Sequence, residues 1–201
     1  MSRELELARE LVRKLEEAEK DNKVQLSELQ PGETFKIGEH DFIVLEQNGC
    51  SGTTNVISKG FMAKDIVFDN NTRDYNKSNL KRVIEENIQP VIESEIGAGN
   101  IIKQAVSLTS VDMQDEFKPC YCKVRPITFN EARKYNNLLA NKEIGDWWWT
   151  CTPWSTDDRG WERAVAVVSS SGSINGSHCD GISGVRPFCI LKSNIFVSKG
   201  E

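Results

Sequence analysis

The chain has 201 residues, which suits one domain with an appended element or two small domains. Apolar residues make up 38% of the sequence and charged residues 27%, so the chain can bury an ordinary core. The formal net charge is −5, and no stripe of lysine or arginine is present, which argues against a nucleic-acid-binding protein. No apolar run is long enough to span a bilayer, so we expect no membrane contact.

Two further features of the sequence concern the compartment. Residues 1–6 are too charged to open a signal peptide, so we expect the chain to stay in the cytoplasm as synthesised, unless it leaves inside a larger particle such as a virion. Without export, cysteines stay as free thiols rather than disulfides. The six cysteines are Cys50, Cys120, Cys122, Cys151, Cys179 and Cys189.

Residues 2–22 predict one amphipathic helix, because apolar residues recur there at spacings of three and four. The apolar stripe consists of Leu5, Leu7, Ala8, Leu11, Val12, Leu15 and Ala18. Either the helix packs on its own domain, or it is a short oligomerisation arm, since the stripe continues for only about two heptads. We therefore assign residues 1–23 to an N-terminal helix and residues 24–201 to one domain.

Several elements are predicted in the first half of that domain. Residues 34–38 and 41–46 are typical of a β-hairpin that turns around residues 38–40, and residues 53–58 predict a third strand. Ser78 is a suitable N-cap for a helix from residue 79 to about residue 87, which Pro90 is expected to stop. Residues 91–126 carry no clear pattern.

The second half begins with another helix and continues as strands. Thr128 and Glu131 have the spacing of a capping box, which predicts a helix to about Ala140. Residues 147–151 and 164–168 predict buried strands, with a tight turn at residues 171–173. Residues 185–191 predict a final strand, in which Pro187 indicates an edge or a bulge. Strands at both ends with helices between them favour an α+β fold closed by pairing of its termini.

The composition changes sharply after residue 143. All five tryptophans lie between Trp147 and Trp161, and no lysine occurs from residue 143 to residue 191. Recognition surfaces favour this mixture, because tryptophan offers rigid contact area while Ser, Gly and Asn adapt their hydrogen bonding. We expect residues 147–149 to be structural. Trp154 and Trp161 lie in a polar loop, where we expect them to be exposed.

An ordered series of segments carries a resemblance to a known family. Residues 147–153 (WWWTCTP), 164–167 (AVAV), 171–174 (SGSI) and 184–188 (GVRPF) resemble the C-terminal block of bacterial and phage domains with a C-type-lectin-like fold. Residues 35, 43–45 and 128–132 resemble the first strands and the late helix of that family. The resemblance covers roughly residues 24–197 and implies a C-type-lectin-like fold behind the N-terminal amphipathic helix.

The same ending is similar to the variable proteins of diversity-generating retroelements, which are ligand-display domains of phages and bacteria. Residues 156–160 and 175–180 are rich in the residue types that randomised asparagine codons produce in that family. The resemblance implies a non-enzymatic binding module of phage or prophage type that recognises a protein or glycan through loops at about residues 153–163 and 175–183. An intracellular inhibitor of a host protein is an alternative. The candidate ligand-binding residues are Trp154, Asp157, Asp158, Arg159, Trp161, Arg163, Asn175, Ser177, His178 and Asp180.

Departures from related families limit the chemistry that we expect. The triplets that bind calcium in true C-type lectins do not occur, so ligand binding is expected to be calcium-independent. Formylglycine-generating oxidases share the general fold, but the spacing of Cys179 and Cys189 does not match their copper-binding pair, which leaves an oxidase as a second alternative. Cys120 and Cys122 lack a second pair of ligands. We therefore predict no catalytic residue, metal or cofactor.

Overall fold

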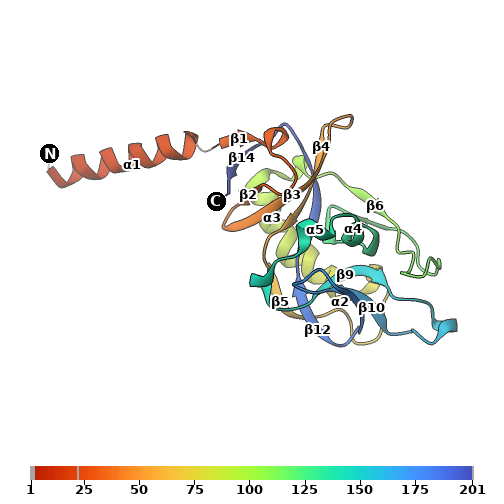
Figure 1. Ribbon diagram of the computed structural model, residues 1–201. Helices are drawn as coiled ribbons and strands as arrows, with labels where there is room; N and C mark the ends of the chain where they lie inside the picture. Colours follow the sequence, from red (N-terminus) through yellow and green to blue (C-terminus); the bar gives the residue numbers. More distant parts are fainter. Residues whose placement is uncertain (1–2, 22, 201) are drawn as a thin grey trace.

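The computed structural model describes residues 3–21 and 23–200. It has a mixed α+β fold, in which an N-terminal helix, α1 (Arg3–Asp21), precedes a body of mainly antiparallel sheets with short helices between them (Figure 1). The predicted α+β class and the predicted N-terminal helix are confirmed; residues 2 and 22 of that prediction lie outside the described residues.

Seven strands form the larger sheet, in the order β1-β14-β2-β3-β4-β13-β8, with every neighbouring pair antiparallel. Their bounds are β1 (Lys23–Gln25), β2 (Thr34–Ile37), β3 (His40–Asn48), β4 (Thr53–Ser58), β8 (Val124–Pro126), β13 (Pro187–Lys192) and β14 (Phe196–Lys199). The predicted hairpin and third strand are confirmed. Strand β14, which the sequence analysis missed, lies between β1 and β2, so the predicted pairing of the termini is confirmed as well.

The second sheet has five strands in the order β11-β10-β9-β12-β5. Their bounds are β5 (Ala63–Val67), β9 (Trp148–Pro153), β10 (Ala164–Val168), β11 (Ile174–His178) and β12 (Ile182–Val185). The β12–β9 pair is parallel, whereas the other neighbours are antiparallel. A third, two-stranded sheet joins β6 (Gln104–Val106) to β7 (Cys120–Cys122).

The predicted final strand, residues 185–191, is in fact two strands in two sheets. The chain leaves β12 at Val185 and enters β13 at Pro187, so Arg186 is the crossing point. Strand β13 lies between β4 and β8, and the expectation of an edge strand is therefore wrong. Proline is accommodated because it is the first residue of β13, where a ladder hydrogen bond is dispensable.

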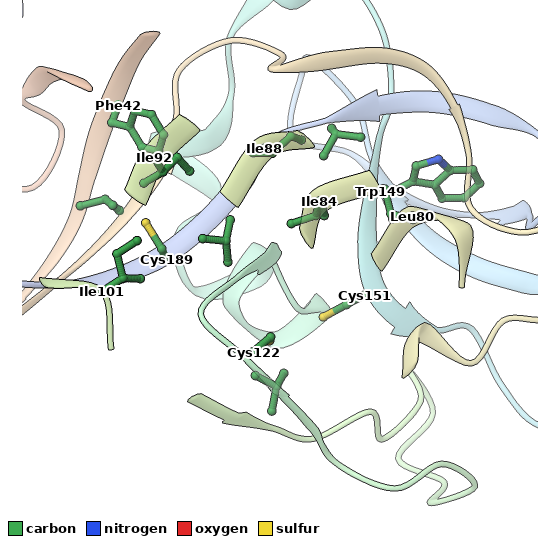
Figure 2. Close-up of a cluster of buried hydrophobic side chains, with 14 of the residues drawn as sticks. Phe42, Leu80, Ile84, Ile88, Ile92, Ile101, Cys122, Trp149, Cys151 and Cys189 are labelled. Carbon is green, nitrogen blue, oxygen red and sulfur yellow. The ribbon is translucent and has the colours of Figure 1, made fainter. Parts of the chain in front are cut away.

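A long helical segment packs against both sheets and carries a row of buried side chains (Figure 2). It consists of α2 (Asn79–Val83), a π-helical segment (Ile84–Ile88) and α3 (Gln89–Ile96). As predicted, Ser78 caps its start, and the Ser78 side chain accepts a hydrogen bond from the Lys81 amide. Its buried residues Leu80, Ile84, Ile88 and Ile92 are spaced by four. In a pure α-helix that spacing rotates each side chain by about 40° from the last. The wider π turn reduces this rotation and keeps the row facing the core.

Pro90 does not stop this helix, contrary to the sequence analysis. The Gln89 amide bonds to the Ile84 carbonyl, five residues back, and Pro90 stands in the first turn of α3. An amide hydrogen is not required from a residue in the first turn of a helix, so proline fits there. The π segment thus creates a second helix start within one continuous helical segment.

The late helix begins as predicted and ends differently. The Thr128 side chain accepts from the Glu131 amide, and the Glu131 side chain accepts from the Thr128 amide, so the capping box is confirmed. The predicted single helix to Ala140 is instead two, α4 (Phe129–Lys134) and α5 (Asn136–Leu139). Tyr135 separates them at φ −102°, and its hydroxyl donates to Glu46 at 2.5 Å.

Helix α1 extends away from the body, from the side of β1 and β14 (Figure 1). Leu5, Leu7, Leu11 and Val12 are 46–61% exposed, so the expectation that this face packs on its own domain is wrong for them. Within residues 3–21 and 23–200, no helix has the length and apolar character needed to cross a membrane.

Candidate recognition surface

The long loop between β9 and β10, residues 154–163, projects from one end of the smaller sheet (Figure 1). A hydrogen bond of 2.9 Å from the Trp154 amide to the Ala164 carbonyl closes its base. A short 3-10 turn, Asp157–Arg159, forms its tip and ends at Gly160, which adopts the left-handed φ of 75° that favours glycine. The loop therefore has a defined backbone, and three side-chain clusters attach it to distant segments.

The first cluster centres on Arg73, whose side chain is only 1% exposed. Its Nη2 donates to Asp157 Oδ1 at 2.5 Å and to Glu116 at 2.8 Å, and its Nε donates to the Trp161 carbonyl at 2.8 Å. The guanidinium also lies over the Phe117 ring, 5.1 Å from the centroid. Burial raises the pKa of the Glu116 carboxyl more than Arg73 lowers it. One buried cation thus joins the loop 154–163 to residues 116–117.

The second cluster centres on Asp112. This carboxylate accepts from Ser110 and Ser155, each at 2.6 Å, and forms an ion pair with Arg159. These contacts, with Ser110 and Ser155 the strongest, lower the pKa of Asp112 to about 2. The carboxylate therefore stays charged at neutral pH and holds the loops 110–117 and 154–163 together.

The third cluster lies at the other end of the loop. Arg163 Nη2 donates to the Asn70 carbonyl at 2.6 Å and to Asp180 Oδ2 at 3.0 Å. Asp180 also contacts the His178 ring, and the hydrogen bond from His178 is the largest cause of the lowered pKa of Asp180. The turn after β11 is therefore tied to the loop 154–163 and to the polar segment 69–73.

These four segments, residues 69–73, 110–117, 154–163 and 178–180, form what we call the recognition surface. Two large apolar side chains are exposed on it: Trp161 at 48% and Met113 at 69%. Met113 has a left-handed φ of 64°, which is unusual for a side chain of its size. Hydrogen bonds from Ser110 to Asp112 and from the Gln114 amide to Ser110 hold the backbone on either side of Met113.

The two loop tryptophans differ in their exposure. Their ring centroids are 6.4 Å apart, but Trp154 is partly buried, whereas Trp161 is exposed. Trp154 covers Gly176 of β11 so closely that a methyl group on Gly176 would lie 3.0 Å from the indole. The predicted exposure is confirmed for Trp161, while Trp154 serves to pack the loop onto the sheet.

The predicted second loop, residues 175–183, starts as strand β11, so only residues 179–181 form its turn. Asn175 and Ser177 line a shallow hollow of about 290 Å³ together with Trp147 and Ile182, whose side chain is 61% exposed. The hollow is thus built from the smaller sheet rather than from a free loop.

Most of the predicted scaffold residues are buried as expected, whereas Trp147 is only partly buried and lines the hollow. Trp148 and Trp149 are fully buried, and Trp149 Nε1 donates to the Ile66 carbonyl at 2.7 Å. Arg186 is also fully buried, donates to the carbonyls of Ser58 and Leu139 at 2.9 Å each, and lies over the Trp148 ring. Burial without an acidic partner lowers the pKa of Arg186 to about 10.

The structure brings together most of the ten predicted site residues, but not as free side chains. Asp157, Arg159, Arg163 and Asp180 are engaged in ion pairs, and Asp158 is exposed beside them. The sequence analysis missed the partners of Arg163, Asp157 and Arg159, which lie 93, 84 and 47 residues away. These partners are Asn70, Arg73 and Asp112; Glu116, which pairs with Arg73, and the exposed Met113 were missed as well. The sequence offers only one indication of these residues: they lie in two polar, turn-rich stretches in which apolar residues do not recur at regular spacing.

Residues 58–193 match the family model described as "Domain of unknown function (DUF6273)". The match spans more than half of the chain, so the chain belongs to this family. No curated protein and no solved structure matches the chain. The matched region contains all four segments of the recognition surface and leaves out α1, β1 to β3, nearly all of β4, and β14.

Proposed function

We propose that this member of the DUF6273 family is a non-enzymatic binding module that recognises a protein partner through the recognition surface. One observation carries the proposal: Trp161 and Met113 are 48% and 69% exposed on loops that buried or paired charges hold in position. Exposed large apolar side chains on an otherwise polar surface are typical of interaction sites.

The three arginines of the surface support a preorganised site. Arg73, Arg159 and Arg163 each pair with a carboxylate of another loop, so the loops need little further ordering when a ligand binds. Ordering side chains and loops is a major cost of association, and a site ordered in advance avoids it. Trp161 then acts as a rigid anchor that loses little conformational entropy.

The exposure of Trp161 and Met113 favours a protein over a small molecule as the partner. Two hollows border the surface, one of about 290 Å³ at Asn175 and Ser177 and one of about 570 Å³ at Ser110 and Met113, so the preference rests on the exposed side chains and not on pocket volume. A glycan remains the alternative, because aromatic rings such as Trp161 also stack on sugars. An intracellular inhibitor of a host protein would use the same surface.

A C-type-lectin-like fold and a phage or prophage display role, of the kind served by retroelement variable proteins, are part of this proposal. Three features support them: the β1–β14 pairing closes the termini, the Trp148–Arg186 contact joins two of the resembling segments, and a loop between those segments carries the exposed Trp161. We also propose that residues 1–23, which contain α1, and residues 24–201 are separate structural units.

The oxidase alternative requires two neighbouring thiols. Cys179 lies in the turn after β11, where its amide donates to the Arg163 carbonyl at 2.7 Å. Cys189 lies inside β13, opposite Val56 and Val124 of the larger sheet. Cys179 thus lies in a turn beside the smaller sheet and Cys189 in a strand of the larger sheet, and this placement favours a binding module. Stoichiometric copper binding that is lost in Cys179→Ala or Cys189→Ala would support the oxidase instead.

The proposal can be tested by partner capture with matched variants. Immobilised wild-type protein, the double variant Trp161→Ala/Met113→Ala and the control Tyr121→Ala are each exposed to host-cell proteins and to a glycan array. Tyr121 is 65% exposed but lies on β7, outside the recognition surface. We expect a protein that the wild type and the control retain and the double variant loses. Retention by all three, or no retained partner, would contradict the proposal.

A further inference from the structure

The apolar face of α1 is unpartnered in a way that the proposed function does not explain. Leu5, Leu7, Leu11 and Val12 are each about half exposed or more, although leucine and valine are ordinarily buried. Four large apolar side chains in two turns of one helix form a contiguous patch rather than scattered surface residues.

We infer that α1 is an assembly helix that joins three or more copies of this chain in a parallel bundle. The sequence continues the apolar pattern at residues 15 and 18, so the stripe extends over most of the 19-residue helix. At 3.6 residues per turn, it covers about 160° of the helix circumference. The seam of a two-stranded coiled coil is narrower, whereas a wide stripe suits a helix that contacts two neighbours.

Heptad positions support copies of the same chain in parallel. When Ala8 and Leu11 take positions a and d, the next heptad places Leu15 and Ala18 at the same positions. In a parallel arrangement, each g position of one helix faces an e position of its neighbour, marked here with a prime. Residue 7 then pairs with residue 12′, and both are apolar. Residue 14, a lysine, pairs with residue 19′, a glutamate. The helix is thus complementary to itself in this arrangement.

The charge of α1 disfavours a membrane as the occupant of this face. The sequence from residue 3 to residue 21 has five basic and seven acidic residues, a net charge of −2. Helices that lie on membrane surfaces are usually rich in lysine and arginine on the polar face, because the lipid surface is anionic.

The position of α1 gives the assembly a consequence for binding. Helix α1 leaves the body beside β1 and β14 of the larger sheet, whereas the recognition surface belongs to the end of the smaller sheet (Figure 1). A parallel bundle would carry several recognition surfaces around a common axis, at the same end of the bundle. Linked sites of this kind bind a multivalent partner by avidity.

The test measures the solution mass of the full chain by sedimentation equilibrium over a wide concentration range. The variants are Leu11→Glu/Val12→Glu on the apolar face and Glu6→Gln as a control on the polar face. We expect the wild type and the control to have at least three times the chain mass of 22.7 kDa, and the double variant to have the mass of one chain. The thermal unfolding of the body should be the same in all three.

Two outcomes overturn the inference that α1 assembles the chain. One is a monomeric wild type, and the other is a double variant that keeps the wild-type mass. A double variant whose body unfolds at a lower temperature would show that α1 packs on its own domain, which also overturns the inference.

The orientation of the helices in the bundle is tested with Ala8→Cys in a Cys50→Ser background. A parallel bundle places the new thiols together and forms a disulfide-linked dimer on oxidation, and failure to cross-link an intact multimer rejects the parallel arrangement.

Discussion

Arg73 and Asp157 are 84 residues apart in the sequence, yet Arg73 Nη2 lies 2.5 Å from Asp157 Oδ1. The arginine is 1% exposed and the aspartate 67%, so a buried cation reaches a carboxylate at the molecular surface. The same guanidinium bonds to Glu116 and to the Trp161 carbonyl. The position of the exposed Trp161 therefore depends on a residue that lies 88 positions earlier in the sequence.

Replacing Arg73 should destabilise the fold far more than replacing its exposed partner. Arg73→Ala removes a buried cation and its packing on Phe117, and we expect a loss of about 2–3 kcal/mol, because the freed carboxylates are partly hydrated. Asp157→Asn should cost less than about 1 kcal/mol. Urea unfolding of both variants measures the difference, and equal losses would show that Asp157 carries the interaction.

The Asp112 cluster predicts a dependence of stability on pH. The pKa of Asp112 is lowered to about 2 in the folded state, below its usual value near 3.8. A depressed pKa contributes stability that is present above pH 4 and is lost as the pH falls from about 4 to 2. We expect Asp112→Asn to lower the urea midpoint at pH 7 and to bring it closer to that of the wild type at pH 2.5. A constant difference at both pH values would exclude this role.

Gly184 should tolerate no side chain, although its backbone conformation is ordinary. A methyl group there would lie 2.4 Å from the Phe61 ring, so Gly184→Ala should cost about 1–3 kcal/mol by overpacking. Gly99→Ala is the matched control, since nothing lies within 4 Å of its added carbon. Thermal unfolding measures both, and if the clash is the cause, Phe61→Ala should destabilise the Gly184→Ala variant less than it destabilises the wild type.

The six thiols should differ in reactivity. Cys50 is exposed, whereas burial raises the pKa of Cys151 and of Cys189 to about 12. The thiolate is the reactive form, so an aromatic disulfide reagent at pH 8 should label one thiol rapidly in the folded protein and all six after denaturation. The rapid phase should vanish in Cys50→Ser. A second rapid thiol in the wild type would indicate that one of the buried cysteines is accessible.

Several elements could be predicted because their causes are local. The capping box at Thr128 and Glu131 involves groups three residues apart, and the strand at residues 53–58 follows from side-chain composition alone. The resembling segments around Trp148 and Arg186 were assigned to the scaffold, and both residues are fully buried. In each case, the deciding interactions lie within a short stretch or follow from burial of an apolar type.

Other features depend on contacts between distant segments, which local sequence patterns do not reveal. Pro90 predicts a helix end, but the helical segment continues past it, because the π segment accommodates the proline and the side chains from Leu80 to Ile92 are buried in the core. Arg73 and Asp112 look like ordinary loop residues until the fold places them beneath the loop 154–163.

The sequence by itself therefore determined the fold class, six of the fourteen described strands, both helix caps and two of the four segments of the recognition surface. The tertiary structure decided which of its side chains are free. Arg159 and Arg163 are held by carboxylates, whereas Trp161 and Met113 are exposed. The physical reason is that ion pairing and burial depend on distances between residues far apart in the chain, whereas turn and strand preferences are properties of neighbouring residues.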